Sequence, residues 1–164
     1  MSAPSTGYGL QAGDGERIEM LGTVTTVLAG VDTGASFMAL AADWPADAKV
    51  PSHIHDAEDE AFYVLEGRVR VKCGTDEWVL EPGGFAYLPR GVMHEPGAEG
   101  PGAARVLILT SRPGLEQFFA KVASELAASG GPPDLAMLDR LGAPYGLHHF
   151  PPGTAGPPSR PDSD

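Results

Sequence analysis

Two histidines separated by one residue, followed closely by a glutamate, constrain this chain more than any other stretch of its sequence. His53 and His55 would point the same way from a β-strand, because side chains alternate between its two faces, so one metal ion could contact both. Glu60 follows at an odd offset, which would face it away on an unbroken strand. We therefore expect the acidic run 56–59 to turn the chain. Glu60 then returns toward the histidines at the start of a strand that stops at Gly67.

A second segment offers a fourth ligand. A short strand lies between a Gly-Gly pair at 83–84 and a Pro-x-Gly turn at 89–91, and His94 follows this turn. Three imidazoles and one carboxylate suit a first-row divalent metal, and this set contains no thiolate. Such a set leaves coordination positions for water or substrate, so the sequence predicts a reactive metal site.

These two segments together resemble the motifs of the cupin superfamily. The first motif is matched by His53, His55, Glu60 and Gly67, and the second by Gly83, Pro89, Gly91 and His94. The resemblance implies an all-β fold, a jelly-roll-like β-barrel, with His53, His55, Glu60 and His94 as metal ligands. It implies one divalent transition metal per chain, which could be iron, manganese, cobalt, nickel, copper or zinc. Two positions depart from the family pattern, Asp47 and Ala98, and neither is a ligand position in the family.

The rest of the chain predicts strands first and helices afterwards. Strands are expected at 17–29, 34–42, 50–55, 61–65, 68–73, 78–80, 85–88 and 104–111. Apolar residues then recur at intervals of three and four, which predicts an amphipathic helix over 114–128, with a shorter helix over 134–141. We therefore divide the chain into a flexible N-terminus (1–15), a cupin barrel (16–112), C-terminal helices packed on the barrel (113–150) and a Pro-rich disordered tail (151–164).

Composition supports one compact domain and excludes some partners. The chain has 164 residues, of which 42% are hydrophobic, and a formal charge of −11. That charge repels phosphate backbones and anionic lipids, so we expect neither nucleic acid nor membrane as a partner. The single cysteine, Cys73, excludes an internal disulfide and is interpreted as a buried apolar residue. No export signal or membrane span is visible, so a cytoplasmic location is expected.

Several residues near the motifs have simpler interpretations than ligation. Glu58 and Asp59 are interpreted as solvated carboxylates of the turn, and the pair His148-His149 as surface or hydrogen-bonded core residues. Aromatic residues of the strands are interpreted first as barrel filling: Phe37, Phe62, Phe85 and Tyr87. The candidates for a substrate pocket are Met38, Phe62, Phe85 and Tyr87. Phe62 leads them because it shares the face of Glu60.

The resemblance extends to single-domain cupins related to bacterial quercetin 2,3-dioxygenase, through the helix after the barrel and the closing segment 143–147. It implies a metal-dependent dioxygenase that cleaves an aromatic hydroxy-ketone such as a flavonol with dioxygen, with Glu60 as both ligand and proton acceptor. Two other classes stay open: a metal-dependent polyketide cyclase or isomerase that needs no dioxygen, and a cupin that only binds a small molecule. A homodimer is expected from the family's habit of pairing barrels and from the apolar strand at 17–29.

Overall fold

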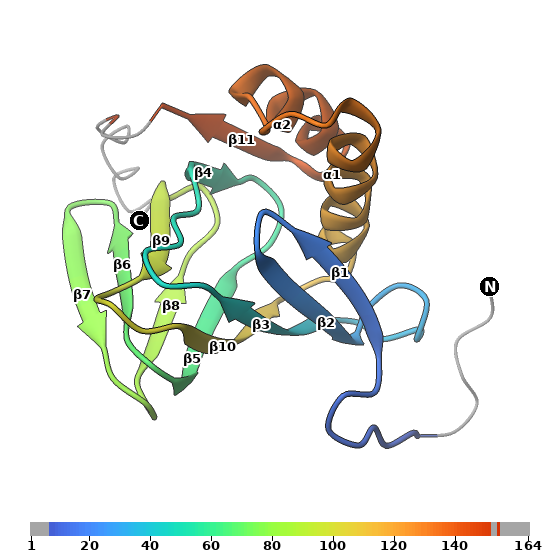
Figure 1. Ribbon diagram of the computed structural model, residues 1–164, viewed down its shortest axis with the longest axis horizontal. Coiled ribbons are helices and arrows are strands. Elements are labelled where there is room, and N and C mark those ends of the chain that lie inside the picture. The colour runs from blue at the N-terminus through green and yellow to red at the C-terminus, as the bar shows by residue number, and fades with distance from the viewer. Residues whose placement is uncertain (1–6, 152–153, 155–164) are drawn as a thin grey trace, which may run out of the picture.

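Two antiparallel β-sheets and a C-terminal helical segment form the fold (Figure 1). A computed structural model describes residues 7–151 and 154. The strands are β1 Glu16–Met20, β2 Thr23–Ala29, β3 Met38–Trp44, β4 Ser52–His55, β5 Glu60–Glu66, β6 Val69–Cys73, β7 Asp76–Leu80, β8 Phe85–Leu88, β9 His94–Ala98, β10 Ala104–Thr110 and β11 Leu147–Phe150. One sheet has the order β1-β2-β3-β10-β5-β8 and the other the order β11-β4-β9-β6-β7. This all-β architecture is the one expected of a cupin barrel.

The core lies between the two sheets and follows the alternation of each strand. In β5, Phe62 and Val64 are buried while Tyr63 and Leu65 are exposed. The turn after this strand needs its glycine, because Gly67 has a φ of 73° and a Cβ there would overlap the carbonyl oxygen of Ala103.

The C-terminal segment is attached to the barrel by the buried face of a helix and by the pairing of a short strand. Helix α1 (Leu115–Ser129) buries one face, which includes Phe118 and Val122, and it ends at Gly130 in the left-handed conformation. Helix α2 (Leu135–Gly142) begins at Asp134, whose side chain accepts a hydrogen bond from the backbone N–H of Met137 at 2.7 Å. A 3-10 turn (η1, Ala143–Tyr145) then leads into β11, which pairs with β4. Figure 1 shows α1, α2 and β11 together at one end of the strands.

Four details differ from the sequence prediction, and the first is that the strand predicted at 34–42 is β3, which begins only at Met38 and runs to Trp44. The single strand expected at 17–29 is a hairpin, because Leu21 (φ 53°) and Gly22 (φ 76°) turn the chain between β1 and β2. Strand β9 was missed because it contains Pro96 and Gly97, which are typical of turns. Strand β11 was also missed, since it is only four residues long and forms by pairing with β4.

The expected barrel filling by Phe37, Phe85 and Tyr87 is wrong. Phe37 is 47% exposed, Phe85 57% and Tyr87 55%. In β8 it is Ala86 and Leu88 that point inward, and Ala86 lies opposite Phe62 on β5. Both faces of this strand are apolar in sequence, so periodicity alone could not decide which face is buried.

The two ends of the chain are only partly described. Residues 7–14 are irregular, and the Tyr8 hydroxyl donates a hydrogen bond to the carbonyl oxygen of Leu28 at 2.6 Å. The tail predicted to be disordered (151–164) lies outside the described residues apart from 151 and 154. None of the helices in the described part of the chain is long and apolar enough to cross a membrane.

Candidate metal centre

Four predicted ligands come together inside the barrel from three strands. His53 and His55 lie on β4, Glu60 begins β5 and His94 begins β9. One ligand atom from each lies within 4.8 Å of the others, and all four residues are buried. The strand register explains why the histidines of β4 and β9 lie close together, because His53 lies directly opposite His94 in the pairing of these strands. The turn at 56–59 carries Glu60 back, as expected.

Each histidine is held by a hydrogen bond from its Nδ1 atom. His53 Nδ1 lies 2.7 Å from the carbonyl oxygen of Pro51, and His94 Nδ1 lies 3.1 Å from that of Val92. His55 Nδ1 lies 2.8 Å from Glu58 Oε1. Carbonyl and carboxylate oxygens only accept, so Nδ1 is the donor in all three rings. The three Nε2 atoms are therefore the ones that remain to bind a ligand.

The Nε2 atoms converge on the carboxylate of Glu60. Glu60 Oε2 lies 3.0 Å from His94 Nε2 and 3.5 Å from His55 Nε2. His55 Nε2 is fully buried and has no hydrogen-bond partner among the described residues. Such an atom is costly to bury, and a divalent cation among these atoms would give it a partner. The residues present thus fit a metal with three nitrogen donors and one oxygen donor.

Burial and mutual charge shift the pKa values of this cluster in different directions. Burial, reinforced by His94 and His55, lowers the pKa of His53 well below its ordinary value. Burial also acts to lower the pKa of His55, but its hydrogen bond to Glu58 and the negative charge of the nearby Glu60 outweigh this and raise it to about 9. Burial alone would raise the pKa of Glu60, yet His55 and His94 hold it well below its usual range. Glu60 is therefore a carboxylate at neutral pH.

Glu58 belongs to this site, which corrects its interpretation as a solvated turn residue. Its side chain is 7% exposed and accepts the Nδ1 hydrogen of His55. A carboxylate behind a ligating imidazole fixes the ring and increases its basicity. The signal in the sequence is that Glu58 lies three residues after His55. This spacing also fits a carboxylate of the turn, which is how the sequence analysis interprets it.

Asp59 and Arg90 join the two motif segments. Asp59 Oδ1 accepts from the backbone N–H and from Nε of Arg90, both at 3.0 Å, and Asp59 Oδ2 accepts from Nη2 at 3.0 Å. These hydrogen bonds hold the pKa of the Asp59 carboxyl well below its usual range. The N–H of Gly91 also donates to the carbonyl oxygen of His55 at 2.7 Å. The loop before His94 is thus fixed against the turn before Glu60.

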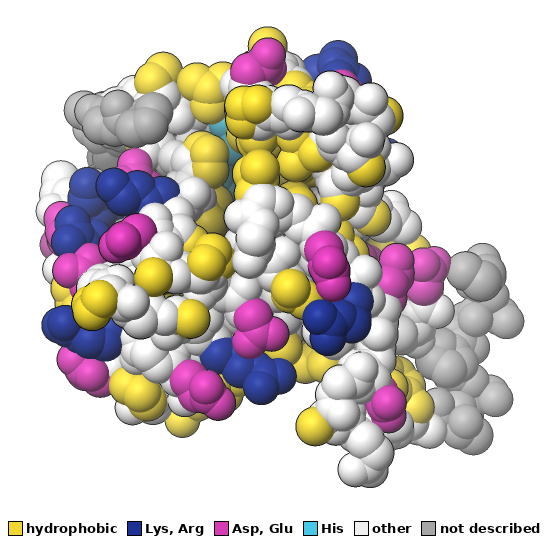
Figure 2. All heavy atoms as spheres, in the orientation of Figure 1, with side chains coloured by type: hydrophobic (Ala, Val, Ile, Leu, Met, Phe, Trp, Pro, Cys, Tyr) yellow, Lys and Arg dark blue, Asp and Glu magenta, His cyan; other side chains and the backbone are white. Residues whose placement is uncertain are grey.

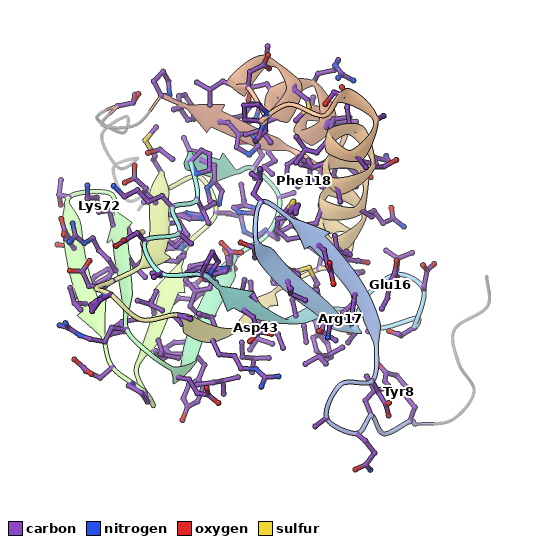
Figure 3. All side chains as sticks on the ribbon, in the orientation of Figure 1. Tyr8, Glu16, Arg17, Asp43, Lys72 and Phe118 are labelled. Carbon is purple, nitrogen blue, oxygen red and sulfur yellow. The ribbon has the colours of Figure 1, made fainter. Side chains whose placement is uncertain are left out.

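A cavity of about 340 Å³ lies beside the ligands. His53, His55 and Glu60 line it together with Phe62 and Trp44, whose rings meet edge to face at 6.1 Å. The remaining wall is mostly apolar and comes from the β1–β2 hairpin, from the loop 45–51 and from the C-terminal segment. Figure 2 shows a hollow among hydrophobic side chains below the C-terminal helices, with a histidine at its base. Phe118 points from α1 toward the strands (Figure 3).

Of the four residues predicted to form a substrate pocket, only Phe62 lines this cavity. Its shared face with Glu60 indicated this position. Met38 is fully buried in the core without lining the cavity, and Phe85 and Tyr87 lie exposed on the outside of β8. Sequence reasoning missed other wall residues: Trp44, Phe118 and His149. Trp44 stands before a proline, a pattern that indicates only the end of a strand, and the other two residues lie far from the motifs along the chain.

The role of Glu58 gives a first prediction. Glu58→Gln keeps an oxygen that can accept from His55 Nδ1–H but removes the negative charge, so we expect metal affinity to fall by about 10- to 100-fold. Competition with a chelator measures this affinity, and circular dichroism checks the fold. The control is Glu81→Gln, which alters a surface ion pair with Arg68 and should leave the affinity unchanged. An unchanged affinity in Glu58→Gln would contradict the assigned role.

Comparisons with known proteins agree with this geometry. The sequence pattern of the cupin domain matches residues 41–110. Quercetin 2,3-dioxygenase of Bacillus subtilis (strain 168) is 27% identical over 88 residues, which cover 53% of this chain and 26% of that protein. The chain therefore spans about a quarter of the length of this relative.

Two solved structures show the same fold at low sequence identity. KdgF from Halomonas sp. has a TM-score of 0.59 and 20% identity over 68% of this chain and 99% of its own. The polyketide cyclase RemF from Streptomyces resistomycificus has a TM-score of 0.57 and 19% identity, covering 64% of this chain and 79% of its own. Residues 41–110 of this chain thus match the cupin domain, and both motifs lie around one buried cluster of possible metal ligands.

Proposed function

We propose that this protein is a metal-dependent dioxygenase that cleaves an aromatic hydroxy-ketone of the flavonol type. The observation that carries the proposal is the position of Glu60, which belongs to the ligand cluster and also lines an apolar cavity large enough for an aromatic molecule. A substrate in this cavity meets the ligand cluster at its base. Its polar end then lies at the cluster and its rings against the wall.

Glu60 is the residue placed to move a proton. A divalent metal bound by the four ligands would supply Lewis-acid activation of a substrate hydroxyl and a place for dioxygen beside it. The hydroxyl loses its proton as it becomes electron-rich, and Glu60 is the ionised carboxylate at that end of the cavity. Glu58 is not placed to serve instead, because it lies behind the His55 ring, where its Oε1 accepts from Nδ1–H, and it does not line the cavity.

The cavity wall suits a flat apolar body. Trp44 and Phe62 supply rings from the barrel, and Phe118 supplies one from α1. Aromatic side chains favour stacked or edge-to-face contacts with another ring. The apolar wall also keeps water from the reacting end of the substrate, which strengthens the electrostatic interactions there. The likeness to quercetin 2,3-dioxygenase supports the same substrate class, over the part of that protein that matches.

A second candidate is a cyclase or isomerase that uses the metal and Glu60 without dioxygen. Such an enzyme would use the same metal site as a Lewis acid and the same carboxylate as a base. It would need no dioxygen, because proton transfer needs no oxidant. A cupin that only binds a small molecule would use the cavity and not the proton transfer. Oxygen uptake on adding quercetin to metal-loaded protein supports the dioxygenase. Conversion of a substrate without oxygen uptake supports the cyclase or isomerase.

Glu60 distinguishes catalysis from binding. Glu60→Gln should keep the fold and a substantial part of the metal, yet lose turnover of quercetin by about 10²- to 10⁴-fold, the range for a removed general base. Oxygen uptake measures the rate, and metal analysis of the same sample corrects it for occupancy. Glu66→Gln is the matched control, since it makes the same change at the exposed end of the same strand. Full activity in Glu60→Gln with a normal pH profile would rule out the role as proton acceptor.

We also propose a homodimer that uses the outer face of β5 and β8. Tyr63, Leu65, Phe85 and Tyr87 are 41%, 40%, 57% and 55% exposed on these neighbouring strands. Several large apolar side chains gathered on one face are typical of a protein interface. Their partner in this proposal is the same face of a second copy, as in isologous dimers.

Light scattering at micromolar concentration should therefore give the mass of two chains. Phe85→Glu places a charge in the interface and should shift the protein to monomers. Trp78→Glu is the matched control, because Trp78 is 40% exposed on β7 of the other sheet and should leave the dimer intact. A monomeric wild-type protein would refute the proposal, and a dimer unaffected by Phe85→Glu would exclude this face.

A further inference from the structure

The C-terminal strand brings a third histidine to the wall of the cavity, beside His53 and His55. Strand β11 pairs with β4 so that Leu147 lies opposite His55 and His149 opposite His53. Residues opposite each other on paired strands point to the same face of the sheet. Leu147 and His149 accordingly share the inner face with the two ligands, and both line the cavity.

One ring nitrogen of His149 is buried there without a hydrogen-bond partner among the described residues. The residue is 9% exposed, and its ring centre lies 5.9 Å from that of His53 and 5.6 Å from that of Phe118. Its Nδ1 is fully buried and has no hydrogen-bond partner among the residues that the structure describes. The nearest carboxylate oxygen, Asp139 Oδ1, is 3.5 Å away and already accepts the backbone N–H of His149 at 2.7 Å.

The surroundings of His149 make a purely structural role a poor explanation. The C-terminal part of the wall is otherwise apolar, with Leu115, Phe118, Phe119, Val122, Pro133, Leu138 and Leu147. A hydrocarbon at position 149 would fill this place without an unpaired nitrogen. Burial lowers the pKa of His149, so the neutral ring has one donor and one acceptor nitrogen to offer. A buried polar group that faces a cavity is what a site uses to select a ligand.

We propose that His149 binds the substrate, by a hydrogen bond to an oxygen other than the one held at the metal. His149 is not one of the clustered ligands, so its partner lies on the apolar body of the substrate. The substrate class is thus an aromatic hydroxy-ketone with a further hydroxyl or carbonyl group, and the C-terminal segment selects for that group. This inference rests on the proposed function in one respect: it requires that the cavity binds such an aromatic molecule, and it requires no particular reaction.

Two probes that share the metal-binding end test this selection. Quercetin and 3-hydroxyflavone have the same hydroxy-ketone unit, but only quercetin carries hydroxyls on its other rings. Their dissociation constants are measured by fluorescence titration of metal-loaded protein without oxygen, so that no turnover is needed. The dissociation constant of wild-type protein for quercetin should be about tenfold lower than that for 3-hydroxyflavone. This is the effect of one hydrogen bond to a buried group that is otherwise left unpaired.

His149→Phe should abolish this preference, so that the dissociation constants of the two probes lie within about twofold of each other. The affinity of this variant for 3-hydroxyflavone should be kept or improved, because the new ring can stack on Phe118. His149→Gln retains a donor and an acceptor and should keep part of the preference. It also tests the inference if the phenylalanine variant fails to fold. The matched control is His148→Phe, because His148 is exposed and pairs with Asp56 outside the cavity. Metal content should be equal in all four proteins.

The outcomes separate this inference from the proposed reaction. A quercetin preference that His149→Phe removes supports the inference even where no oxygen is consumed, in which case only the dioxygenase proposal fails. No preference in the wild-type protein, an equal preference in His149→Phe, or no binding of either probe would overturn the inference. A more stable His149→Phe with unchanged binding would assign the residue to packing alone.

Discussion

The hydrogen bonds from Nδ1 of three histidines are the interactions on which the site depends. Two are accepted by backbone carbonyls and one by the buried carboxylate of Glu58. By fixing each ring, they leave the three Nε2 atoms for one point beside Glu60. The arrangement is costly without a cation, because His55 Nε2 is buried unpaired next to a carboxylate. Hydrogen bonds to the backbone and to Glu58 thus orient the three rings, and His55 Nε2 is the buried atom that a bound metal would satisfy.

The fold serves this geometry by bringing distant segments to the same place. Strands β4 and β9 are neighbours in one sheet, while β5 belongs to the other, so the ligands bridge the inside of the barrel. The Asp59–Arg90 contacts hold the two loops that lead to Glu60 and His94. The C-terminal segment then extends the ligand-bearing sheet through β11 and encloses the cavity with α1 and α2. This enclosure gives the cavity a mostly apolar wall above the ligand cluster.

The sequence predicted what is encoded locally. The four ligands could be found because alternation along a strand and a turn at 56–59 determine where His53, His55 and Glu60 point. The helix at α1 followed from its apolar periodicity. Local patterns could not choose between two apolar faces, so Phe85 and Tyr87 were placed inside when they lie outside.

Features that depend on tertiary pairing were beyond the sequence. Strand β11 forms only against β4, and His149 reaches the cavity only through that pairing. Glu58 looked like a turn carboxylate, because its burial depends on how the turn folds back over His55. The cavity wall is assembled from segments that lie far apart along the chain, and no single motif contains it.

The metal content of protein purified without added metal tests whether these four side chains bind a metal. We expect about one divalent transition metal per wild-type chain, and little or none in His55→Ala and His94→Ala, with the β-barrel intact by circular dichroism. Each variant removes one converging Nε2 atom and leaves the strands that carry the others. Full metal occupancy in both variants would contradict this assignment, because the metal would then be held somewhere other than this cluster.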